Sequence, residues 1–586
     1  MRKRLPLLAI LLAFISLQAQ EKKKDTLIKP EVVNIETKYN PKIANVNKIK
    51  TNPKIELLHK TKKKKLDYTI FSAPVASTFL PKTGVVKGIN VGVRERIYNN
   101  YLAAGYGNFN TPYGELQLYH HTRFNNEFGI NAKYNASYQK IQNTILNSTF
   151  SNFNASAFYK KETRYFDWKI TAETQLNSYN WYGLPEIDFT KNTINSIEEA
   201  QMYTYAKLEN YFKVYDSYID SAKINFSFFS DAFNSSEILA NFNVNLNFPL
   251  DFISPKLNEI SVATDLEYLK GFFSQNYSKT SSINYNQITA RIDPSYTLNY
   301  LGLFLKAGVK TAISLDPEND ANNVLVFPDI LAKQVILKKH INLYGGITGN
   351  LHTNTYQEFA EENPFISPNL FITQTAETAN YFLGLNGNIT TSLNYNIKAA
   401  YKTEEDKPLF VRNNSKSNGV TNTFNNQVLK GYEFGNSFTV FYDDINTTQF
   451  TAEMEYFYNK NLTFSTGLEF NNYTVTNALD SYNLPDLQGV FLAKYKTQKW
   501  FATTNIFYVA ARTDVLYNSE YPSAISSLQS LNAFVDVNLN GGYHFNDKFS
   551  AFLRLNNILN TNYQRFANFN VQGFQALGGF TYKFDF

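Results

Sequence analysis

The chain has 586 residues, a formal net charge of +6 and no cysteine, which excludes disulfide bonds and thiolate chemistry. Aromatic residues make up 16% of the sequence, and the mean hydropathy is −0.34. No segment approaches the roughly 18 consecutive apolar residues of a membrane-spanning helix, so helical spans are excluded.

The N-terminus has the pattern of a secretory signal peptide. Residues 2–4 are basic, residues 5–17 are apolar, and the small Ala19 marks the expected cleavage point. An uncleaved anchor is the alternative, but an apolar run of about 13 residues is short for a bilayer, which needs roughly 20. We therefore expect residues 1–19 to be a signal peptide.

Residues 20–85 form a basic segment without the pattern of a folded core. Residues 21–70 contain fourteen Lys and six acidic residues, so the net positive charge of the chain belongs here and is no argument for nucleic-acid binding. A tetrapeptide occurs twice in this segment, as Asn40, Pro41, Lys42, Ile43 and again as Asn52, Pro53, Lys54, Ile55. Either the segment is a solvated periplasmic linker, or it is an extended peptide that docks in the lumen or on a periplasmic partner.

From residue 86 to the end, the sequence alternates between apolar and polar residues. In 238–248, apolar residues alternate with a row of Asn, and 128–138 follow the same period. Because Asn is a poor strand former in soluble sheets, a row of Asn indicates a strand face that meets water inside a barrel. A β-sandwich or β-helix is the alternative. We predict an all-β fold, a large antiparallel transmembrane β-barrel of the outer membrane over residues 86–586.

The C-terminal residues predict the closing strand of this barrel. An aromatic, apolar face ends on Phe580, Tyr582, Phe584 and Phe586, and these four residues are the candidate membrane-insertion signal. We also expect aromatic girdles at the two membrane interfaces. The candidate girdle residues are Trp168, Trp181, Trp500, Tyr563, Phe566, Phe580 and Phe586.

The connections alternate between long and short. If the closing strand ends in the periplasm, the long connections 473–485, 516–530 and 559–573 are extracellular, and the short ones between them are periplasmic. The segment 443–447 is expected to be an unusually short outer connection. Strand spacing predicts about 22 strands, with a range of roughly 18 to 24, and an even number.

Residues 430–586 resemble the barrel of TonB-dependent outer-membrane receptors, of the type found in Bacteroidota. The similarity rests on the motifs at 429–435, 438–445, 484–487 and 555–563 and on the terminal strand 580–586. The resemblance implies a wide receptor barrel. Such receptors carry a plug domain of well over a hundred residues before the barrel, and no plug can be placed in residues 20–85. The lumen should then be filled by inward-folded loops, by the N-terminal segment or by a partner.

The sequence shows no catalytic, cofactor-binding or metal-binding motif. Gly105-Tyr106-Gly107 lacks the third glycine of a dinucleotide-binding loop, and His120-His121 would point to opposite faces of a strand. The acidic turn at 316–320 lacks the glycine and the distal Glu of a calcium loop. We expect no enzyme activity and no cofactor.

Two functions are compatible with these patterns. The protein could carry a solute across the outer membrane through a lumen lined by Asn, Thr, Lys and Glu. Alternatively, it could be a structural or accessory barrel of a secretion or envelope-biogenesis assembly, with the basic tail bound to a partner. Expected partners are outer-membrane lipid, the barrel-assembly machinery and a periplasmic or outer-membrane protein, with no nucleic acid.

Overall fold

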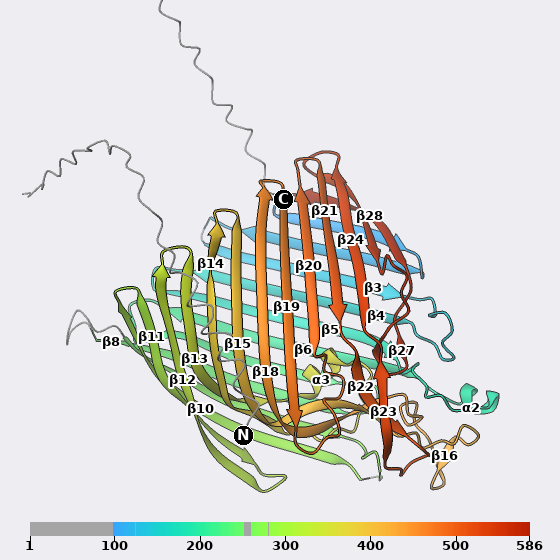
Figure 1. Ribbon diagram of the computed structural model, residues 1–586. Coiled ribbons are helices and arrows are strands. Elements are labelled where there is room, and N and C mark those ends of the chain that lie inside the picture. The colour runs from blue at the N-terminus through green and yellow to red at the C-terminus, as the bar shows by residue number, and fades with distance from the viewer. Residues whose placement is uncertain (1–97, 124, 251–258, 279–280, 586) are drawn as a thin grey trace, which may run out of the picture. The chain divides into compact units, whose positions relative to one another are not determined.

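The computed structural model describes residues 98–123, 125–250, 259–278 and 281–585. Within them, 22 strands form one antiparallel sheet that closes on itself (Figure 1). The strands of its first half are β1 (Asn100–Gly107), β2 (Thr111–His121), β3 (Asn126–Ser137), β4 (Phe150–Glu162), β5 (Phe166–Asn180), β6 (Ala200–Val214), β7 (Ile219–Ser230), β8 (Ser236–Pro249), β9 (Glu259–Phe273), β10 (Ile283–Tyr300) and β11 (Leu303–Asp316). Those of its second half are β12 (Ala321–Leu337), β13 (Ile341–Thr353), β14 (Gln374–Thr390), β15 (Leu393–Arg412), β18 (Phe438–Asn459), β19 (Leu462–Val475), β20 (Leu487–Lys496), β21 (Trp500–Val509), β24 (Phe534–His544), β25 (Phe549–Asn556) and β28 (Gln575–Phe584).

The two faces of each barrel strand have opposite chemistry. In β8, Phe242 faces outward and is 45% exposed, while Asn241 and Asn243 bond to neighbours on the inner face. Exposed Leu, Ile, Phe and Tyr recur in the same outward positions on strand after strand. An apolar outer surface around a polar lumen is the arrangement of an outer-membrane barrel, which confirms the predicted fold class and location. No helix in the described part of the chain is long and apolar enough to cross a membrane.

The barrel closes where the first strand meets the last. β28 pairs with β25 on one edge and with β1 on the other, where Ala104 lies opposite Phe580 and Asn100 opposite Phe584. The predicted closing strand is therefore confirmed, and so is the predicted strand number. The signal peptide, the basic segment and the beginning of the barrel domain at residue 86 lie outside the described residues and stay predictions.

The two ends of the barrel differ in their connections. At the end where β28 terminates, the connections contain two to four residues, apart from that of residues 250–258. The opposite end carries loops of up to 25 residues, and we assign it to the cell exterior. These outer loops contain α2 (Lys191–Asn195), α3 (Tyr356–Glu362) and three hairpins, β16 (Thr423–Phe424) with β17 (Gln427–Val428), β22 (Arg512–Tyr517) with β23 (Ile525–Leu531), and β26 (Gln564–Phe566) with β27 (Phe569–Asn570).

One predicted connection is wrong. Residues 443–447 lie inside β18, which runs without interruption from Phe438 to Asn459, and the outer connection before it spans residues 413–437. The sequence alone predicted a connection here because Asp443 is of a residue type that is common in turns. In the structure it accepts hydrogen bonds from the backbone of Asn477 and Ala478 in the next outer loop, at 2.9 Å from each nearest oxygen.

Candidate functional site: the outer half of the lumen

The outer loop between β13 and β14 folds into the barrel and carries α3. Thr355 caps the helix, and its side chain accepts a hydrogen bond from the Glu358 backbone N at 3.1 Å. The helix ends at Glu362, two residues before Pro364. The spacing Thr355-x-x-Glu358 followed by Pro364 is a helix-start and helix-stop pattern that could have been recognised in the sequence.

A buried carboxylate on the barrel wall holds the beginning of α3. Glu237 of β8 is 3% exposed and accepts hydrogen bonds from the backbone N of Tyr356 at 2.7 Å and of Gln357 at 3.2 Å. The Tyr285 hydroxyl donates a third hydrogen bond to it at 2.7 Å. A carboxylate at the first turn of a helix satisfies amides that have no partner within the helix, so Glu237 fixes α3 to the wall.

Aromatic rings from three wall strands surround the first residue of α3. Tyr356 is fully buried, and its ring centroid lies 4.9 Å from that of Phe273 and 5.0 Å from that of Phe229. Its hydroxyl donates to Asp231 at 2.8 Å. Burial raises the pKa of the Asp231 carboxyl above its ordinary value. The helix is therefore held by packing as well as by hydrogen bonds.

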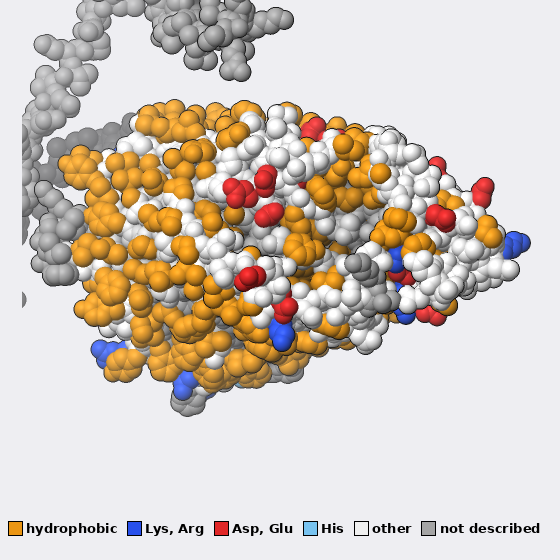
Figure 2. All heavy atoms as spheres, turned by 90° about the horizontal axis from the view of Figure 1, so that it is seen from below, with side chains coloured by type: hydrophobic (Ala, Val, Ile, Leu, Met, Phe, Trp, Pro, Cys, Tyr) orange, Lys and Arg blue, Asp and Glu red, His pale blue; other side chains and the backbone are white. Residues whose placement is uncertain are grey.

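Other outer loops join the β13–β14 loop in a single apolar core. Phe365 stacks on Phe569 with ring centroids 3.8 Å apart, and the Trp181 indole N donates to the Phe365 carbonyl at 3.1 Å. Wall and loop residues share this core, whose buried members are Tyr203, Phe229, Leu269, Phe273, Tyr285, Tyr356, Phe359, Ala360, Ile366, Leu370, Ile372, Phe410, Phe438, Val440, Leu531, Phe566, Ala567 and Phe569. We call this set the outer-loop core. Figure 2 looks at the molecule from below, where hydrophobic side chains cover much of the surface and several acidic side chains lie near the centre.

The β15–β18 loop adds a buried ion pair beside this core. Lys416 and Glu433 are both less than 10% exposed and lie 2.5 Å apart, and the Lys416 ammonium lies 4.5 Å from the centre of the Tyr277 ring. Burial raises the pKa of the Tyr277 hydroxyl well above its ordinary value. The motif at 429–435 lies in this loop, and β18 begins at Phe438, three residues after it.

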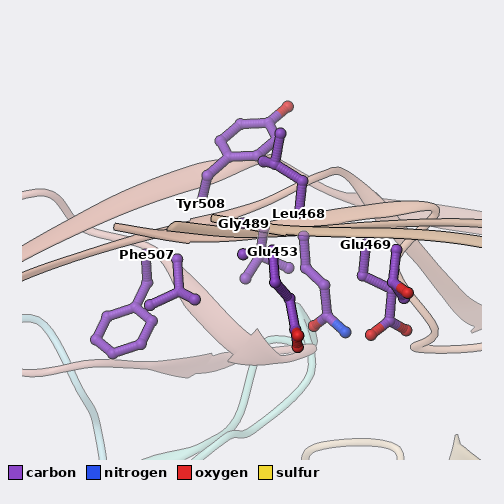
Figure 3. A pocket seen from close by; sticks show the side chains of 11 residues that line it. Glu453, Leu468, Glu469, Gly489, Phe507 and Tyr508 are labelled. Atoms are coloured by element: carbon purple, nitrogen blue, oxygen red, sulfur yellow. The ribbon is translucent and has the colours of Figure 1, made fainter. Parts of the chain in front are cut away.

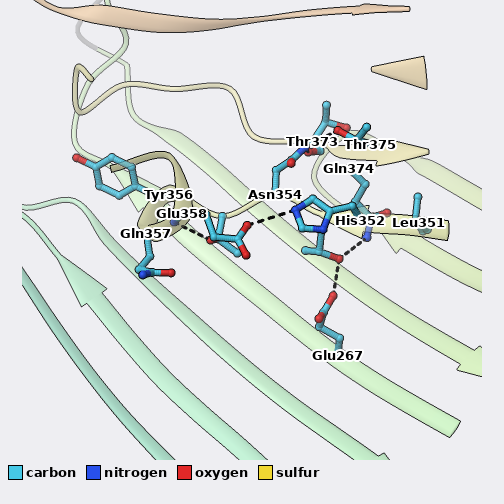
Figure 4. A network of polar contacts seen from close by, with 12 residues as sticks. Glu267, Leu351, His352, Asn354, Tyr356, Gln357, Glu358, Thr373, Gln374 and Thr375 are labelled. Carbon is cyan, nitrogen blue, oxygen red and sulfur yellow. Dashed lines mark hydrogen bonds and ion pairs between the residues drawn. The ribbon is translucent and has the colours of Figure 1, made fainter. Parts of the chain in front are cut away.

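A polar network lies where the two ends of the β13–β14 loop meet the wall (Figure 4). Asn354 donates to the Thr373 carbonyl at 2.7 Å and to the Thr375 hydroxyl at 2.8 Å, which ties the ends of the loop together. His352 lies 3.5 Å from Glu358 of α3. Arg291 of β10 pairs with Asp265 at 2.6 Å and donates to Thr353 at 3.1 Å. The loop is thus attached to the wall at its base as well as at its tip.

The lumen wall further along β18–β21 is polar and open by comparison. Figure 3 shows Glu453, Glu469 and Phe507 on the lumen side, with Leu468 and Tyr508 on the opposite, lipid side. These residues line a hollow of about 270 Å³. Glu453 accepts from Asn396 at 3.0 Å, and Glu469 from Gln449 at 3.0 Å and from Asn471 at 2.9 Å.

The carboxylates on this wall are held by neutral partners. Asn394 donates to Glu455 at 3.2 Å, and no Lys or Arg of the described residues lies within ion-pair distance of Glu453, Glu455 or Glu469. Within the described ranges, no group of three or more His, Cys, Asp and Glu residues could hold a metal ion. The arrangement can hold water and cations loosely, but it shows no built metal centre.

The residues that the sequence predicts to be an insertion signal and a partner-binding segment are described by the structure only in part. Phe580 and Tyr582 face outward on β28 and are 56% and 44% exposed, with Phe584 further along the same strand. Their role as an insertion signal stays a prediction. Phe586 and the repeated tetrapeptide at residues 40–43 and 52–55 lie outside the described residues.

Three predicted girdle residues are wrong. Trp181 is 1% exposed, and Phe566 is 6% exposed within the outer-loop core. Tyr563 turns inward as well, since its hydroxyl donates to Asp536 at 2.9 Å and its ring stacks on Phe534. All three belong to outer loops rather than to barrel strands. The prediction assumed that they lie at the ends of barrel strands, and that assumption is what failed. Trp500 does lie on the outer surface, 57% exposed.

Comparisons with known proteins show the fold. No protein-family model matches the chain, and no curated protein matches it in sequence. The FrpB iron transporter from Neisseria meningitidis superposes with a TM-score of 0.62 at 10% identity, covering 84% of this chain and 82% of that one. The pyoverdine outer-membrane receptor FpvA from Pseudomonas aeruginosa PAO1 superposes with a TM-score of 0.59 at 12% identity, covering 83% and 78%. The ferric-catecholate import receptor Fiu from E. coli K12 gives a TM-score of 0.59 at 9% identity, covering 83% and 82%.

Proposed function

We propose that this protein is an outer-membrane uptake receptor whose outer loops are the gate of its lumen. The outer-loop core carries the proposal, because it places fully buried aromatic side chains where an open porin would have a water-filled channel. A solute can pass only if the β13–β14 loop leaves its position between Glu237 and Phe569. The barrel fold shared with receptors and transporters supports uptake over a merely structural role.

The gate proposal can be tested with a reversible lock, because the chain contains no cysteine. The hydroxyls of Ser367 and Ser437 both accept hydrogen bonds from the Asn413 amide, at 3.0 Å and 2.8 Å. Thiols at these two positions are therefore close enough for a short reagent that couples two thiols through disulfide bonds, which a reductant cleaves, and a Ser→Cys change alters side-chain size little. The double variant Ser367→Cys, Ser437→Cys ties the β13–β14 loop to the residue that precedes β18.

The readout is solute uptake by cells that carry the variant as their only copy. Mass spectrometry of spent medium compares locked cells with cells treated with reductant or carrying one cysteine alone. We expect at least one solute to remain in the medium only when the loop is locked. If every solute is depleted equally in all cultures, the loop is not a gate for uptake and the proposal fails.

Planar-bilayer conductance supplies a second readout that needs no known solute. We expect the purified barrel to conduct little, and a variant lacking residues 356–372 to conduct steadily. A wild-type barrel that conducts as strongly as the deletion variant would mean that the outer-loop core leaves a path open.

The second candidate is a structural barrel of an envelope assembly, and the repeated Asn-Pro-Lys-Ile of the basic segment favours it. Under this proposal, residues 20–85 bind a periplasmic or outer-membrane protein. Affinity purification from native membranes, with and without residues 21–85, separates the two functions. A partner that copurifies with the full-length protein but not with the protein lacking residues 21–85 supports the structural role. If both proteins purify alone, the structural role is refuted.

A further inference from the structure

A small hollow lies where α3 meets the lumen wall of β5 and β6. The lining residues that are not fully buried are Gln175, Asn177, Tyr179, Tyr205, Gln357 and Glu361. The hollow has a volume of about 100 Å³, well below the roughly 300–1,000 Å³ of a small-molecule site. It therefore suits one side chain of a larger guest rather than a whole solute.

The hollow is covered on its outer side and extends toward the periplasm. The Tyr203 hydroxyl in its lining donates to the carbonyl of Pro364 at 3.1 Å, so the segment that follows α3 lies over it. Gln175 and Tyr205 lie opposite each other, nearer the periplasmic ends of β5 and β6 than Tyr179 does. A guest therefore reaches the hollow from the periplasmic side while the β13–β14 loop stays in place.

α3 presents two carboxylates at this hollow that have no cationic partner. Glu361 and Glu362 are exposed, and no Lys or Arg in the described part of the chain lies within ion-pair distance of either carboxylate. Arg565 donates to the backbone carbonyl of Glu362 at 3.2 Å, and Lys207 of β6 pairs with Glu209 at 3.2 Å. The free face of α3 is therefore negative, and a cationic group of a guest would find partners there.

The repeated tetrapeptide of the basic segment carries the side chains that this surface would accept. Residues 40–55 contain Asn-Pro-Lys-Ile twice, with four Lys and no acidic residue. Proline fixes its own φ and keeps the preceding residue extended, so each copy has little conformational freedom to lose on binding. Aromatic side chains are the usual surface for such proline segments. The lysine directly after each proline supplies the charge that Glu361 lacks.

The chain is long enough to bring the tetrapeptides to the hollow. β1 begins at Asn100 at the periplasmic end, and β5 lies four strands away along the sheet, roughly 20 Å. The 15 residues of β5 are about 50 Å long. Residues 56–99 join the second tetrapeptide to β1, and a chain of that length can span up to roughly 145 Å. Attachment to the same chain raises the effective concentration of the segment at any site within its reach.

We propose that the tetrapeptides at residues 40–43 and 52–55 bind in this hollow, with a proline against Tyr179 and Tyr205 and the next lysine beside Glu361. Of the two alternatives that the sequence leaves open for the basic segment, this is binding in the lumen. The inference goes beyond the uptake function and does not rest on it, because binding within one chain needs no solute. It competes with the second candidate function, in which the same segment binds another protein.

The test maps where the segment binds in the full-length protein in outer membranes. A photoreactive amino acid replaces Ile43 or Ile55, one at a time, and mass spectrometry identifies the peptides to which each label couples on illumination. The same label at Ile35, which precedes both tetrapeptides, is the position control. Because these changes lie outside the described barrel, the barrel should fold normally, and heat-dependent mobility on gels confirms that it does.

Two pairs of variants test which charges hold the segment. Lys42→Glu with Lys54→Glu reverses the charge inside the tetrapeptides, and Lys48→Glu with Lys50→Glu makes the same change between them. On the barrel side, Glu361→Gln with Glu362→Gln removes the carboxylates of α3. Glu453→Gln with Glu455→Gln, on the wall of β18, is its matched control.

We expect the labels at 43 and 55 to couple to peptides that contain residues 175–179, 203–205 or 357–361, and the label at 35 to couple to them much less. The yield should fall about threefold or more in Lys42→Glu with Lys54→Glu and in Glu361→Gln with Glu362→Gln, as the loss of two partly exposed ion pairs implies. The two control pairs should leave the yield unchanged.

Several results would overturn the inference. These are coupling only to another protein, coupling only to other parts of the barrel, no coupling at all, or equal yields in a test pair and its control pair. Coupling to another protein would support the structural role of the barrel instead. A segment that couples at the hollow of a protein that depletes no solute refutes the uptake function and leaves this inference standing.

Discussion

The outer-loop core and the lumen wall of β18–β21 lie in the same barrel but differ in the burial and polarity of their side chains. In the core, Tyr356 and Phe438 are fully buried, as in the interior of a soluble protein. On the wall, Glu453 and Glu469 face an open hollow with only neutral hydrogen-bond partners. The difference shows that one barrel combines a loop core packed like a protein interior with a wall that carries polar and charged side chains.

The same comparison separates what holds the barrel from what closes it. The wall is held by the sheet itself, in which each strand is paired on both edges and β28 completes the circle. The outer-loop core is held by side chains, through stacked rings and through Glu237 at the start of α3. Damage to the sheet should therefore destroy the protein, whereas damage to the core should open it.

The largest effect is expected when the closing strand is cut. Deletion of residues 580–586 removes the pairing partners of residues 100–104 in β1 and of residues 549–551 in β25. Without them both edges stay unpaired in lipid, so we expect no folded barrel, measured as loss of the heat-sensitive fast-migrating band and loss from the outer-membrane fraction.

A milder pair of changes tests the insertion-signal proposal separately. Phe580→Ser and Tyr582→Ser keep the backbone pairing and remove only the exposed rings. If the rings are recognised during assembly, the double variant inserts poorly as well. Normal insertion of the truncated chain would contradict the importance of the closing strand, and normal insertion of the double variant would confine that importance to pairing.

The next effect in size concerns the aromatic anchor of α3. Tyr356→Ala removes a fully buried ring and the hydrogen bond to Asp231, which should cost about 3–5 kcal/mol of local stability. We expect faster hydrogen exchange across residues 354–373 and a rise in bilayer conductance, while the barrel stays folded. Tyr381→Ala is the control, because Tyr381 lies on β14 but is 49% exposed on the lipid side. Equal exchange in the two variants would refute the anchoring role.

A smaller effect should appear as a dependence of the gate on pH. The pKa of Asp231 is raised above its ordinary value of 3.8 because burial disfavours the charged form. The docked state then holds its proton more tightly than the open state, so docking is strongest below pH 3.8 and weakens as pH rises through the raised pKa. The protection factors of residues 354–373, which correct for the intrinsic pH dependence of amide exchange, should therefore rise on acidification, and Asp231→Asn should remove the carboxyl's share of this dependence. Protection factors that fall on acidification in the wild type would contradict the sign.

The sequence predicts the wall well and the core poorly, for a physical reason. A barrel strand repeats every two residues, so the Asn row of 241–247 and the closing strand reveal both faces of the sheet at once. Trp181 and Phe566 have no such repeat, because their burial depends on loops that meet across the lumen. Among these loop elements, only α3 has a recognisable sequence pattern, formed by Thr355, Glu358 and Pro364. That pattern predicts a helix, but it does not predict that the helix lies beside Glu237.

The smallest effect is expected on the ion selectivity of the β18–β21 wall, and it can be measured only in a barrel that conducts. In a barrel lacking residues 356–372, the triple change Glu453→Gln, Glu455→Gln, Glu469→Gln removes three carboxylates without altering side-chain size. Because these groups face the lumen and have no described cationic partner, they should attract cations at low salt and be screened at high salt. We expect a reduced cation preference, measured as a shift of the reversal potential in a salt gradient.

Lys398→Gln on the neighbouring strand β15 should shift the potential in the opposite direction. If both changes leave the reversal potential unmoved in the open barrel, ions do not pass along this wall.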